Sequence, residues 1–431
     1  MKLNQDGKSA ASAARSTNYQ AVFIIGVLFF IFGFVTWLNG TLIPFLKLAC
    51  QLDSDVQAFF VTFAFYMAYF CLALPSSFLI KKTGYKRGMS LGLFIMAAGS
   101  AIFIPAAHSR TFGLFLTGLF VQGMGLALLQ TASNPYITII GPIESAAKRI
   151  SIMGICNKTA GMISPLILGA LVLKNATALE TQINTTSNLT EKGNLLQELA
   201  ERVITPYAII TGILILLAFM IWFSPLPEID TDQEVQDAGI KKGKSSVFQF
   251  PYLVLGVLCL FLYVGAEVMA GDAIGTYGKT QGLPLDVTKY FTFFTLAAML
   301  AGYVAGIFTI PRIISQQTGL KISAVLGILF STVVFLTHGY TSIVFIALLG
   351  LANAMIWPAI WPLAISGLGR FTKTGSALLV MGIAGGAIIP LVYSSLKDKL
   401  HVSNSLSFYV CMLPCYVYIL FYAVRGHRAG K

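Results

Sequence analysis

Apolar segments of about the length of a membrane span follow one another along most of the chain, and short polar segments separate them. A helix needs about 20 apolar residues to cross the hydrocarbon core of a bilayer. Twelve segments are close to this length, so the pattern predicts an all-α integral membrane protein with twelve transmembrane helices. The expected spans are Tyr19–Leu46, Val56–Ile80, Gly88–Ala107, Phe112–Ile140, Ile150–Leu173, Val203–Phe223, Phe250–Thr276, Val287–Ile310, Leu320–Thr337, Ile343–Ser366, Gly375–Leu396 and Leu406–Val424.

The polar segment Ser224–Ser246 divides these spans six and six. An internal repeat supports two equivalent halves, because Met153–Leu166 (MGICNKTAGMISPL) and Met381–Leu391 (MGIAGGAIIPL) occupy corresponding places in the fifth and eleventh spans. Such repeats are typical of secondary transporters. We therefore expect a cytoplasmic tail at 1–18, a six-helix bundle at 19–223, a cytoplasmic linker at 224–249, a second six-helix bundle at 250–424 and a cytoplasmic tail at 425–431.

Composition agrees with a membrane protein, since 56% of the residues are hydrophobic, 11% are charged and the mean hydropathy is +0.78. These values exclude an ordinary soluble domain. The net charge of +12 does not indicate a nucleic-acid partner, because nineteen of the 29 Lys and Arg residues fall on the N-terminal side of the predicted membrane, against nine on the other side. The positive-inside rule then places both termini in the cytoplasm.

Apart from Lys289 and Lys321, which lie at the ends of their spans, three charged residues lie inside predicted spans: Lys158 in the fifth, and Glu267 and Asp272 in the seventh. A carboxylate at bilayer depth costs about 2.5–3.5 kcal/mol on insertion scales and usually marks an ion, proton or solute pathway. The two acids are five residues apart, about 140° around a straight helix, so they share a face only if the helix bends. One arrangement pairs Lys158 with one acid and leaves the other to bind a cation; the alternative is a purely structural ion pair.

Amide and aromatic side chains accompany these charges within the spans. They are Asn39, Gln130, Asn134, Asn157, Tyr263, Asn353, Trp357 and Trp361, of which the last three are spaced for one helical face. Amides offer both donors and acceptors to sugar hydroxyls, and the C–H face of a pyranose packs on an indole ring. The alternative is that these amides only join neighbouring helices. We take the set as the candidate sugar site.

The segment after the fifth span is polar and carries three potential glycosylation sequons, at Asn175, Asn184 and Asn188. Connecting segments of this kind lie at the surface and are more mobile than the elements they join. We therefore expect a polar, mobile external loop between the fifth and sixth spans.

Three segments resemble the fucose–galactose–glucose permease family of the major facilitator superfamily: NPYITIIGPIESAAKRISIMGICNKTAG, LIKKTGYKRGMSLGLFIMAAGSAIFIPAA and WPAIWPLAISGLGRFTKTGSALLVMGIAGGAIIPL. The similarity covers nearly the whole chain and is greatest to the bacterial glucose/galactose permease branch, which also includes N-acetylglucosamine permeases. The resemblance implies a transporter with the major facilitator fold, located in the bacterial inner membrane.

The chain departs from the fucose permease pattern at two acids. That branch resembles LND in the first span and ETAANP in the fourth, whereas this chain has Gly40 in LNG and Gln130 in QTASNP. Glu267 stands where the fucose branch is uncharged. The resemblance therefore implies that Glu267 and Asp272 carry ion coupling, with Lys158 as charge partner. Members of the glucose/galactose branch are associated with Na⁺ as well as H⁺, and Na⁺ at Glu267 or Asp272 is compatible with carboxylate chemistry.

We expect a monomeric secondary transporter, not an enzyme, that imports a neutral hexose of the glucose/galactose type by symport with Na⁺ or H⁺. It needs a monosaccharide, a coupling cation and membrane lipid, and no other cofactor. The alternatives are an uncoupled sugar facilitator or exchanger, and an importer of N-acetylglucosamine or fucose. A sugar sensor without transport activity and a hydrophobic drug exporter also remain open at this stage.

Overall fold

The computed structural model describes residues 19–140, 146–227, 246–310 and 313–430, and every regular element in these ranges is helical. The expected N-terminal tail and most of the expected linker lie outside the described residues. We call the helices before residue 228 the N-terminal half and those after residue 245 the C-terminal half.

The N-terminal half contains α1 Tyr19–Thr36, α2 Asn39–Ala49, α3 Asp55–Ala101, α4 Phe103–Ser109, α5 Phe112–Ile139, α6 Ala146–Val172, α7 Ala176–Thr185, α8 Leu189–Glu201 and α9 Ile204–Phe223. The C-terminal half contains α11 Pro251–Gly271, α12 Ile274–Thr280, α13 Leu285–Thr288, α14 Phe291–Thr309, α15 Gln316–Leu336, α16 Gly339–Asn353, α17 Ile356–Ile365, α18 Thr372–Met381, α19 Gly385–Asp398 and α20 Asn404–Val424. Short 3₁₀ segments occur at Val247–Gln249, Gly369–Phe371, Gly382–Ala384 and Gly426–Arg428.

Eleven helical segments of the described residues are long and apolar enough to cross a membrane. One of them, Asp55–Ser109, has 55 residues, which at 1.5 Å per residue is far longer than the roughly 30 Å hydrocarbon core. Gly84 breaks its helical geometry, with φ 78° and ψ 169°. Only glycine adopts such a conformation readily, which explains the break at this residue. The second and third expected spans lie on the two sides of the break.

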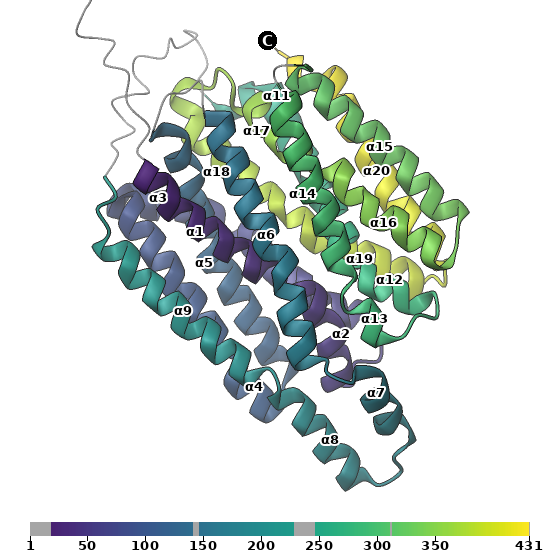
Figure 1. Ribbon diagram of the computed structural model, residues 1–431. Helices are drawn as coiled ribbons and strands as arrows, with labels where there is room; N and C mark the ends of the chain where they lie inside the picture. Colours follow the sequence, from purple (N-terminus) through teal and green to yellow (C-terminus); the bar gives the residue numbers. More distant parts are fainter. Residues whose placement is uncertain (1–18, 141–145, 228–245, 311–312, 431) are drawn as a thin grey trace, which may run out of the picture.

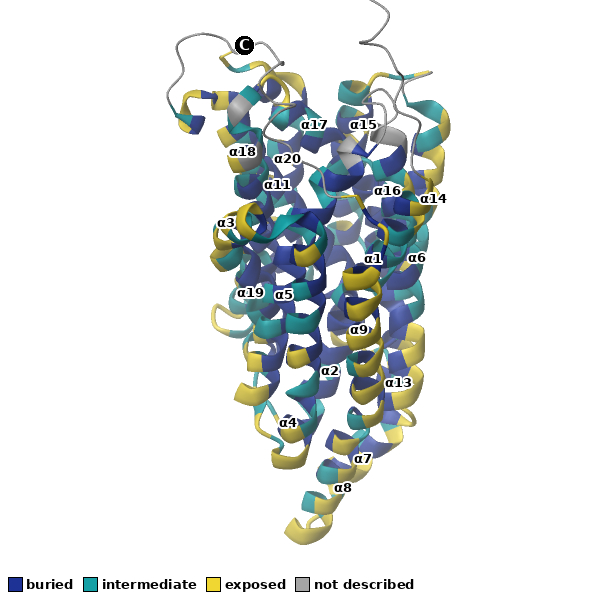
Figure 2. Ribbon diagram, turned by 90° about the vertical axis from the view of Figure 1, so that its left-hand side faces the viewer, coloured by how far each residue is buried: buried dark blue, intermediate teal, exposed yellow. Residues whose placement is uncertain are grey.

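The helices run between two ends of the molecule (Figure 1). We call them the terminal end, where α1 begins and α20 ends, and the α8 end, which carries α7, α8 and α13. Apolar side chains such as Phe219 and Phe223 of α9 are exposed along the outside of the bundle (Figure 2). Such exposure is unfavourable in water and suits a surface that faces lipid.

Several expected spans are interrupted near their middle. Trp37 and Leu38 form a turn between α1 and α2. Asp272 and Ala273 separate α11 from α12. Irregular backbone at membrane depth is stable only where protein or a cavity surrounds it. These breaks therefore mark the interior of the bundle as the region where polar groups can be placed.

Polar side chains of neighbouring helices satisfy carbonyl groups released at these interruptions. Thr292 Oγ1 donates to the carbonyl of Gly271 at 2.8 Å, and Thr295 Oγ1 donates to that of Ala270 at 2.9 Å. In α17, Pro362 cannot donate to the carbonyl of Pro358. Gln316 Nε2 donates to that carbonyl instead, at 3.0 Å.

The segment after the fifth span, expected to be a polar, mobile external loop, is helical. It forms α7 and α8, and Asn188 caps α8 by accepting the N–H of Thr190 at 3.0 Å. The sequence of α8 is amphipathic and buries Leu196 and Leu199. Burial of that apolar face explains why the segment folds, since a short helix gains most of its stability from packing.

Charged groups join the two halves at the α8 end. The carboxylate of Asp55 accepts hydrogen bonds from Lys47 of its own half and Lys397 of the other. The backbone N–H of Val56 donates to Asp398 Oδ2 at 3.1 Å. These contacts hold the ends of α2, α3 and α19 together.

A second group of contacts lies where α7 meets α13. Asp286 accepts the N–H groups of Ala176 and Thr177 at 3.1 and 3.0 Å, so its carboxylate stabilises the positive N-terminal end of α7. Lys289 Nζ donates to the carbonyl of Leu173 at 2.7 Å. The contacts around Asp55 and the contacts around Asp286 together close the α8 end between the halves.

Candidate functional site

A cavity lies between the two halves near the middle of the bundle. Its internal space is about 850 Å³, including the part open to solvent. The N-terminal half contributes Phe29, Phe32, Thr36, Trp37, Tyr66, Tyr69, Gln130, Asn134, Ile150, Gly154, Asn157 and Lys158. The C-terminal half contributes Tyr263, Val264, Glu267, Tyr303, Trp357, Pro358 and Ile383.

The cavity extends toward the terminal end. Ile150 lies about one turn after the start of α6, and Asn134 lies near the end of α5, so both mark the lining closest to that end. A second hollow of about 1170 Å³ lies at the α8 end and is lined by Lys47, Asp55 and other residues. The two cavities share no lining residue. The central cavity is thus separated from the α8 end.

A buried ion pair crosses the cavity. Lys158 Nζ of α6 lies 2.7 Å from Glu267 Oε1 of α11, and the two residues are 7% and 8% exposed. The same ammonium group lies 4.5 Å from the ring centroid of Trp37, at cation–π distance. A buried pair is stable only when partners compensate the loss of hydration. The ion pair and the indole ring therefore form one charged unit that connects the halves.

Aromatic rings form one wall of the cavity. Trp357 and Trp361 stack with centroids 5.6 Å apart and ring planes at 19°, and Tyr263 lies 6.4 Å from Trp357. Trp357 lines the cavity, whereas Trp361 supports it from behind and is 8% exposed. Stacking restricts the orientation of the Trp357 ring. The wall offers a flat apolar face beside polar groups.

Amides from the N-terminal half face this wall. Gln130 Nε2 donates to Tyr69 Oη at 3.2 Å, and Asn157 Nδ2 donates to the carbonyl of Phe29 at 3.4 Å. Asn134 also lines the cavity. Each amide retains further hydrogen-bonding capacity, because an amide carries two donors and an acceptor with two lone pairs.

Asn353 does not line the cavity. Its Oδ1 accepts the hydroxyl of Tyr416 at 2.9 Å, and the residue is fully buried between α16 and α20. The expectation of one helical face shared by Asn353, Trp357 and Trp361 is wrong, because the break between α16 and α17 changes the helical register after Asn353. Asn353 therefore joins two helices of the C-terminal half.

Asn39 and Asp272 also lie outside the cavity lining, and they lie near each other. A Cβ added at Gly40, next to Asn39, would lie 3.2 Å from Asp272 Oδ1. The N–H of Gly40 lies close to this carboxylate. Asp272 is 0% exposed and, unlike Glu267, has no cationic side chain as partner among the described residues. The two acids of the seventh span thus occupy different environments.

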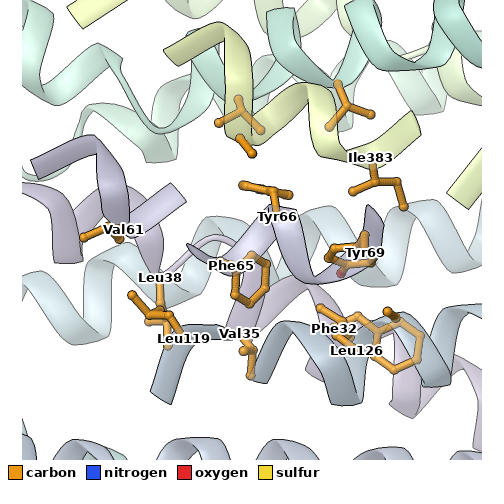
Figure 3. Packing of buried hydrophobic residues seen from close by; sticks show 14 of the residues in the cluster. Phe32, Val35, Leu38, Val61, Phe65, Tyr66, Tyr69, Leu119, Leu126 and Ile383 are labelled. Atoms are coloured by element: carbon orange, nitrogen blue, oxygen red, sulfur yellow. The ribbon is translucent and has the colours of Figure 1, made fainter. Parts of the chain in front are cut away.

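Sequence reasoning did not single out six aromatic residues of the cavity, namely Phe29, Phe32, Trp37, Tyr66, Tyr69 and Tyr303. Tyr66 and Tyr69 are three residues apart in FAFYMAYF, a spacing that places them on one face of α3. Figure 3 shows both between α1, which carries Phe32 and Val35, and Ile383 of the C-terminal half. The three-residue spacing of these two hydroxyl-bearing rings is the feature of the sequence from which they could have been predicted as cavity residues.

Comparison with known proteins agrees with this architecture. Residues 25–392 match the profile of the Major Facilitator Superfamily. The "Glucose/galactose transporter" of Brucella abortus biovar 1 (strain 9-941) is 33% identical over 94% of this chain and 93% of its own length. The "L-fucose-proton symporter" of Escherichia coli (strain K12) is 28% identical over 90% of this chain and 89% of its own length.

A crystal structure of the E. coli fucose:proton symporter superposes on this chain with a TM-score of 0.74 and 26% identity, covering 95% of this chain and 98% of that one. The spans of this chain and the likeness to these relatives identify a multi-pass membrane protein. The family consists of transporters and not of enzymes. The chain belongs to the Major Facilitator Superfamily and, within it, to the fucose–galactose–glucose permease family.

Proposed function

We propose that the protein imports a neutral hexose of the glucose/galactose type by cation symport, through alternating access of the central cavity. The single observation that carries this proposal is the cavity itself, in which amides of the N-terminal half and aromatic rings of both halves surround the Lys158–Glu267 pair. The names of two relatives, a glucose/galactose transporter and an L-fucose-proton symporter, support a sugar as the solute.

Sugar binding is assigned to the groups that face one another across the cavity. Trp357 supplies an apolar face for the C–H groups of a pyranose, and Tyr263 lies beside it. Gln130, Asn134 and Asn157 supply donors and acceptors for the hydroxyl groups. Trp361 acts by fixing the Trp357 ring, and Asn353 acts at a distance through the hydrogen bond that it accepts from Tyr416 of α20.

Ion coupling is assigned to the acids of the seventh span, with Na⁺ or H⁺ as the cation. Lys158 already compensates the charge of Glu267, whereas Asp272 has no such partner. A cation that compensates Asp272 would stabilise the packing of α11 and α12 against α1 and α2. Because sugar and cation would both favour the same arrangement of the halves, each would raise the affinity for the other.

We assign the terminal end to the cytoplasm, because the charge distribution along the sequence supports this orientation. The central cavity then extends toward the cytoplasm, and the ionic contacts around Asp55 and Asp286 close the outside. This is the inward-facing arrangement of an importer in the plasma membrane. Outward opening requires that Lys397 leave Asp55 and that Lys289 leave the carbonyl of Leu173.

One alternative has a specific observation in its favour. The Lys158–Glu267 pair is already neutral, as expected of an uncoupled facilitator or exchanger in which the charges only position the halves. N-acetylglucosamine and fucose remain alternative solutes, because amides and aromatic rings recognise any hydroxylated ring.

Uptake into proteoliposomes tests the proposal, with a panel of labelled sugars and Na⁺ replaced by choline at fixed pH. We expect accumulation of glucose or galactose above equilibrium when a Na⁺ or pH gradient is imposed. Equilibration without accumulation under both gradients would establish the facilitator instead. Binding of sugar without any flux would contradict transport altogether.

A further inference from the structure

A buried wall separates the central cavity from the hollow at the α8 end, and each half crosses it with a broken helix. In the N-terminal half, Trp37 lines the cavity and Ile43 lines the hollow. In the C-terminal half, Glu267 lines the cavity and Gly275 lines the hollow. Every residue between Trp37 and Ile43, and every residue between Glu267 and Gly275, is buried. The break between α11 and α12 therefore lies inside this wall, and the break between α1 and α2 lies at its cavity face.

Trp37 packs on the backbone of both halves at this cavity face. A Cβ added at Gly161 of α6 would lie 2.3 Å from Cδ1 of the ring, and a Cβ added at Gly271 of α11 would lie 2.3 Å from Cζ3. Neither distance leaves room for a side chain, so both contacts depend on glycine. The indole is thus held between one glycine of its own half and one of the other, and it is only 2% exposed.

The contacts of Trp37 with the C-terminal half are apolar. The ring forms a small buried cluster with Leu296, Met299 and Tyr303 of α14. Its Nε1 has no hydrogen-bond partner among the described residues. Movement of the ring away from Gly271 therefore breaks no hydrogen bond of the Trp37 side chain, and packing alone opposes it.

We infer that Trp37 is the outer gate of the transport path: its ring seals the floor of the sugar cavity on the α8 side while the cavity is open toward the terminal end. The inference rests on the proposed alternating access, in which the halves move largely as rigid bodies. The contact with Gly161 lies within one half and persists in both states. The contact with Gly271 crosses the halves and exists only while the α8 end is closed. An apolar constriction of this kind excludes water and polar solutes until it opens.

The gate is also part of the cavity that it seals. Trp37 lines the cavity, and Lys158 Nζ lies 4.5 Å from the centroid of its ring while it pairs with Glu267 of the other half. Opening of the gate moves the ring and Lys158 together relative to Glu267, because both belong to the N-terminal half. A solute bound between the halves at this pair therefore acts directly on the position of the gate.

Hydrogen–deuterium exchange of the purified full-length protein, without sugar or flux, tests the gate with a matched pair of glycine variants. Gly271→Ala places a methyl group in a contact that exists only while the α8 end is closed. It should shift the population toward outward opening, with about tenfold faster exchange in α2 and α12 and slower exchange in α17 at the terminal end. Gly161→Ala overpacks the same ring within one half and should not produce opposite changes at the two ends.

A third variant connects the effect to the ring itself. Trp37→Leu removes the part of the side chain that meets Gly271, so Gly271→Ala should no longer change exchange in that background. Four results would overturn the inference: unchanged exchange in Gly271→Ala, faster exchange at both ends, the same opposite changes in Gly161→Ala, or an effect of Gly271→Ala that persists beside Trp37→Leu.

Trp37→Leu alone decides the matter if Gly271→Ala does not fold. Loss of the seal should still give faster exchange in α2 and α12 and slower exchange in α17, and unchanged exchange in these helices would contradict the gate. Failure of the proposed function is distinguishable, because the opposite changes at the two ends need no sugar and would persist in a protein that shows no sugar counterflow.

Discussion

The carboxylate of Asp272 lies against the backbone of Gly40, although the two residues belong to opposite halves of the molecule. A Cβ at position 40 would lie 3.2 Å from Asp272 Oδ1 and 2.6 Å from Thr292 Oγ1. In the fucose permease pattern an acid projects from this position of the first span. Here a carboxylate from the seventh span reaches the same position, and the glycine leaves room for it.

Gly40→Ala should therefore disturb the junction of α2 with α11. The added methyl group requires movement of Thr292 and of the carboxylate, and overpacking of this kind costs about 1–3 kcal/mol. We expect a lower melting temperature and a weaker dependence of sugar uptake on the cation. Gly212→Ala in α9 is the matched control, because a Cβ there meets no atom within 4 Å. Equal behaviour of the two variants would contradict the tight contact at Gly40.

Asp272→Asn should abolish concentrative uptake and retain exchange of sugar across the membrane. The amide keeps the shape of the side chain but removes the charge that a cation would compensate. The measurement is uptake under an imposed cation gradient, compared with counterflow of labelled sugar without a gradient. Undiminished accumulation in this variant would remove Asp272 from the coupling mechanism.

Lys158→Met should destabilise the protein more than the double change Lys158→Met with Glu267→Gln. The single change leaves Glu267 buried without a partner, which typically costs about 3–5 kcal/mol, whereas the double change removes both charges. Thermal unfolding of the purified variants measures the difference. If the double variant is no more stable than the single one, the pair contributes little in the folded state.

Trp357→Ala should weaken sugar binding more than it changes the dependence on the cation. The substitution removes the apolar face of the cavity, while Asp272 and its surroundings remain. Sugar affinity from counterflow and the cation dependence of uptake are measured in parallel. Trp222→Ala is the control, because Trp222 of α9 is 45% exposed on the outside of the bundle. Parallel loss of both properties in Trp357→Ala would indicate misfolding.

Asp55→Asn should loosen the α8 end. Asp55 is 6% exposed and joins Lys47 to Lys397 of the other half, so the change removes the negative charge that the two lysines share. We expect faster hydrogen–deuterium exchange in peptides that cover the ends of α2, α3 and α19. Asp53→Asn, two residues away and exposed, should exchange like the wild type. Unchanged exchange in Asp55→Asn would mean that these contacts do not keep the α8 end closed.

Hydropathy alone was sufficient to predict an all-helical protein that crosses a membrane many times, because a helix in a bilayer needs a long apolar segment whatever its neighbours are. The expected boundaries of 203–223 and 406–424 differ by two residues or fewer from those of α9 and α20. The breaks in the helices at Trp37 and Asp272 could not be predicted from hydropathy. They depend on polar partners such as Thr292 and Thr295, which lie on another helix.

The sequence by itself determined which residues are unusual for a membrane interior, since a charge or an amide in an apolar segment is visible without coordinates. Only the tertiary structure decided their partners. It brought Lys158 to Glu267 across 109 positions of sequence, placed Asp272 beside Gly40 and turned Asn353 away from the cavity. The physical reason is that an ion pair or a buried contact depends on distance in space, and the packing of two separate halves sets that distance.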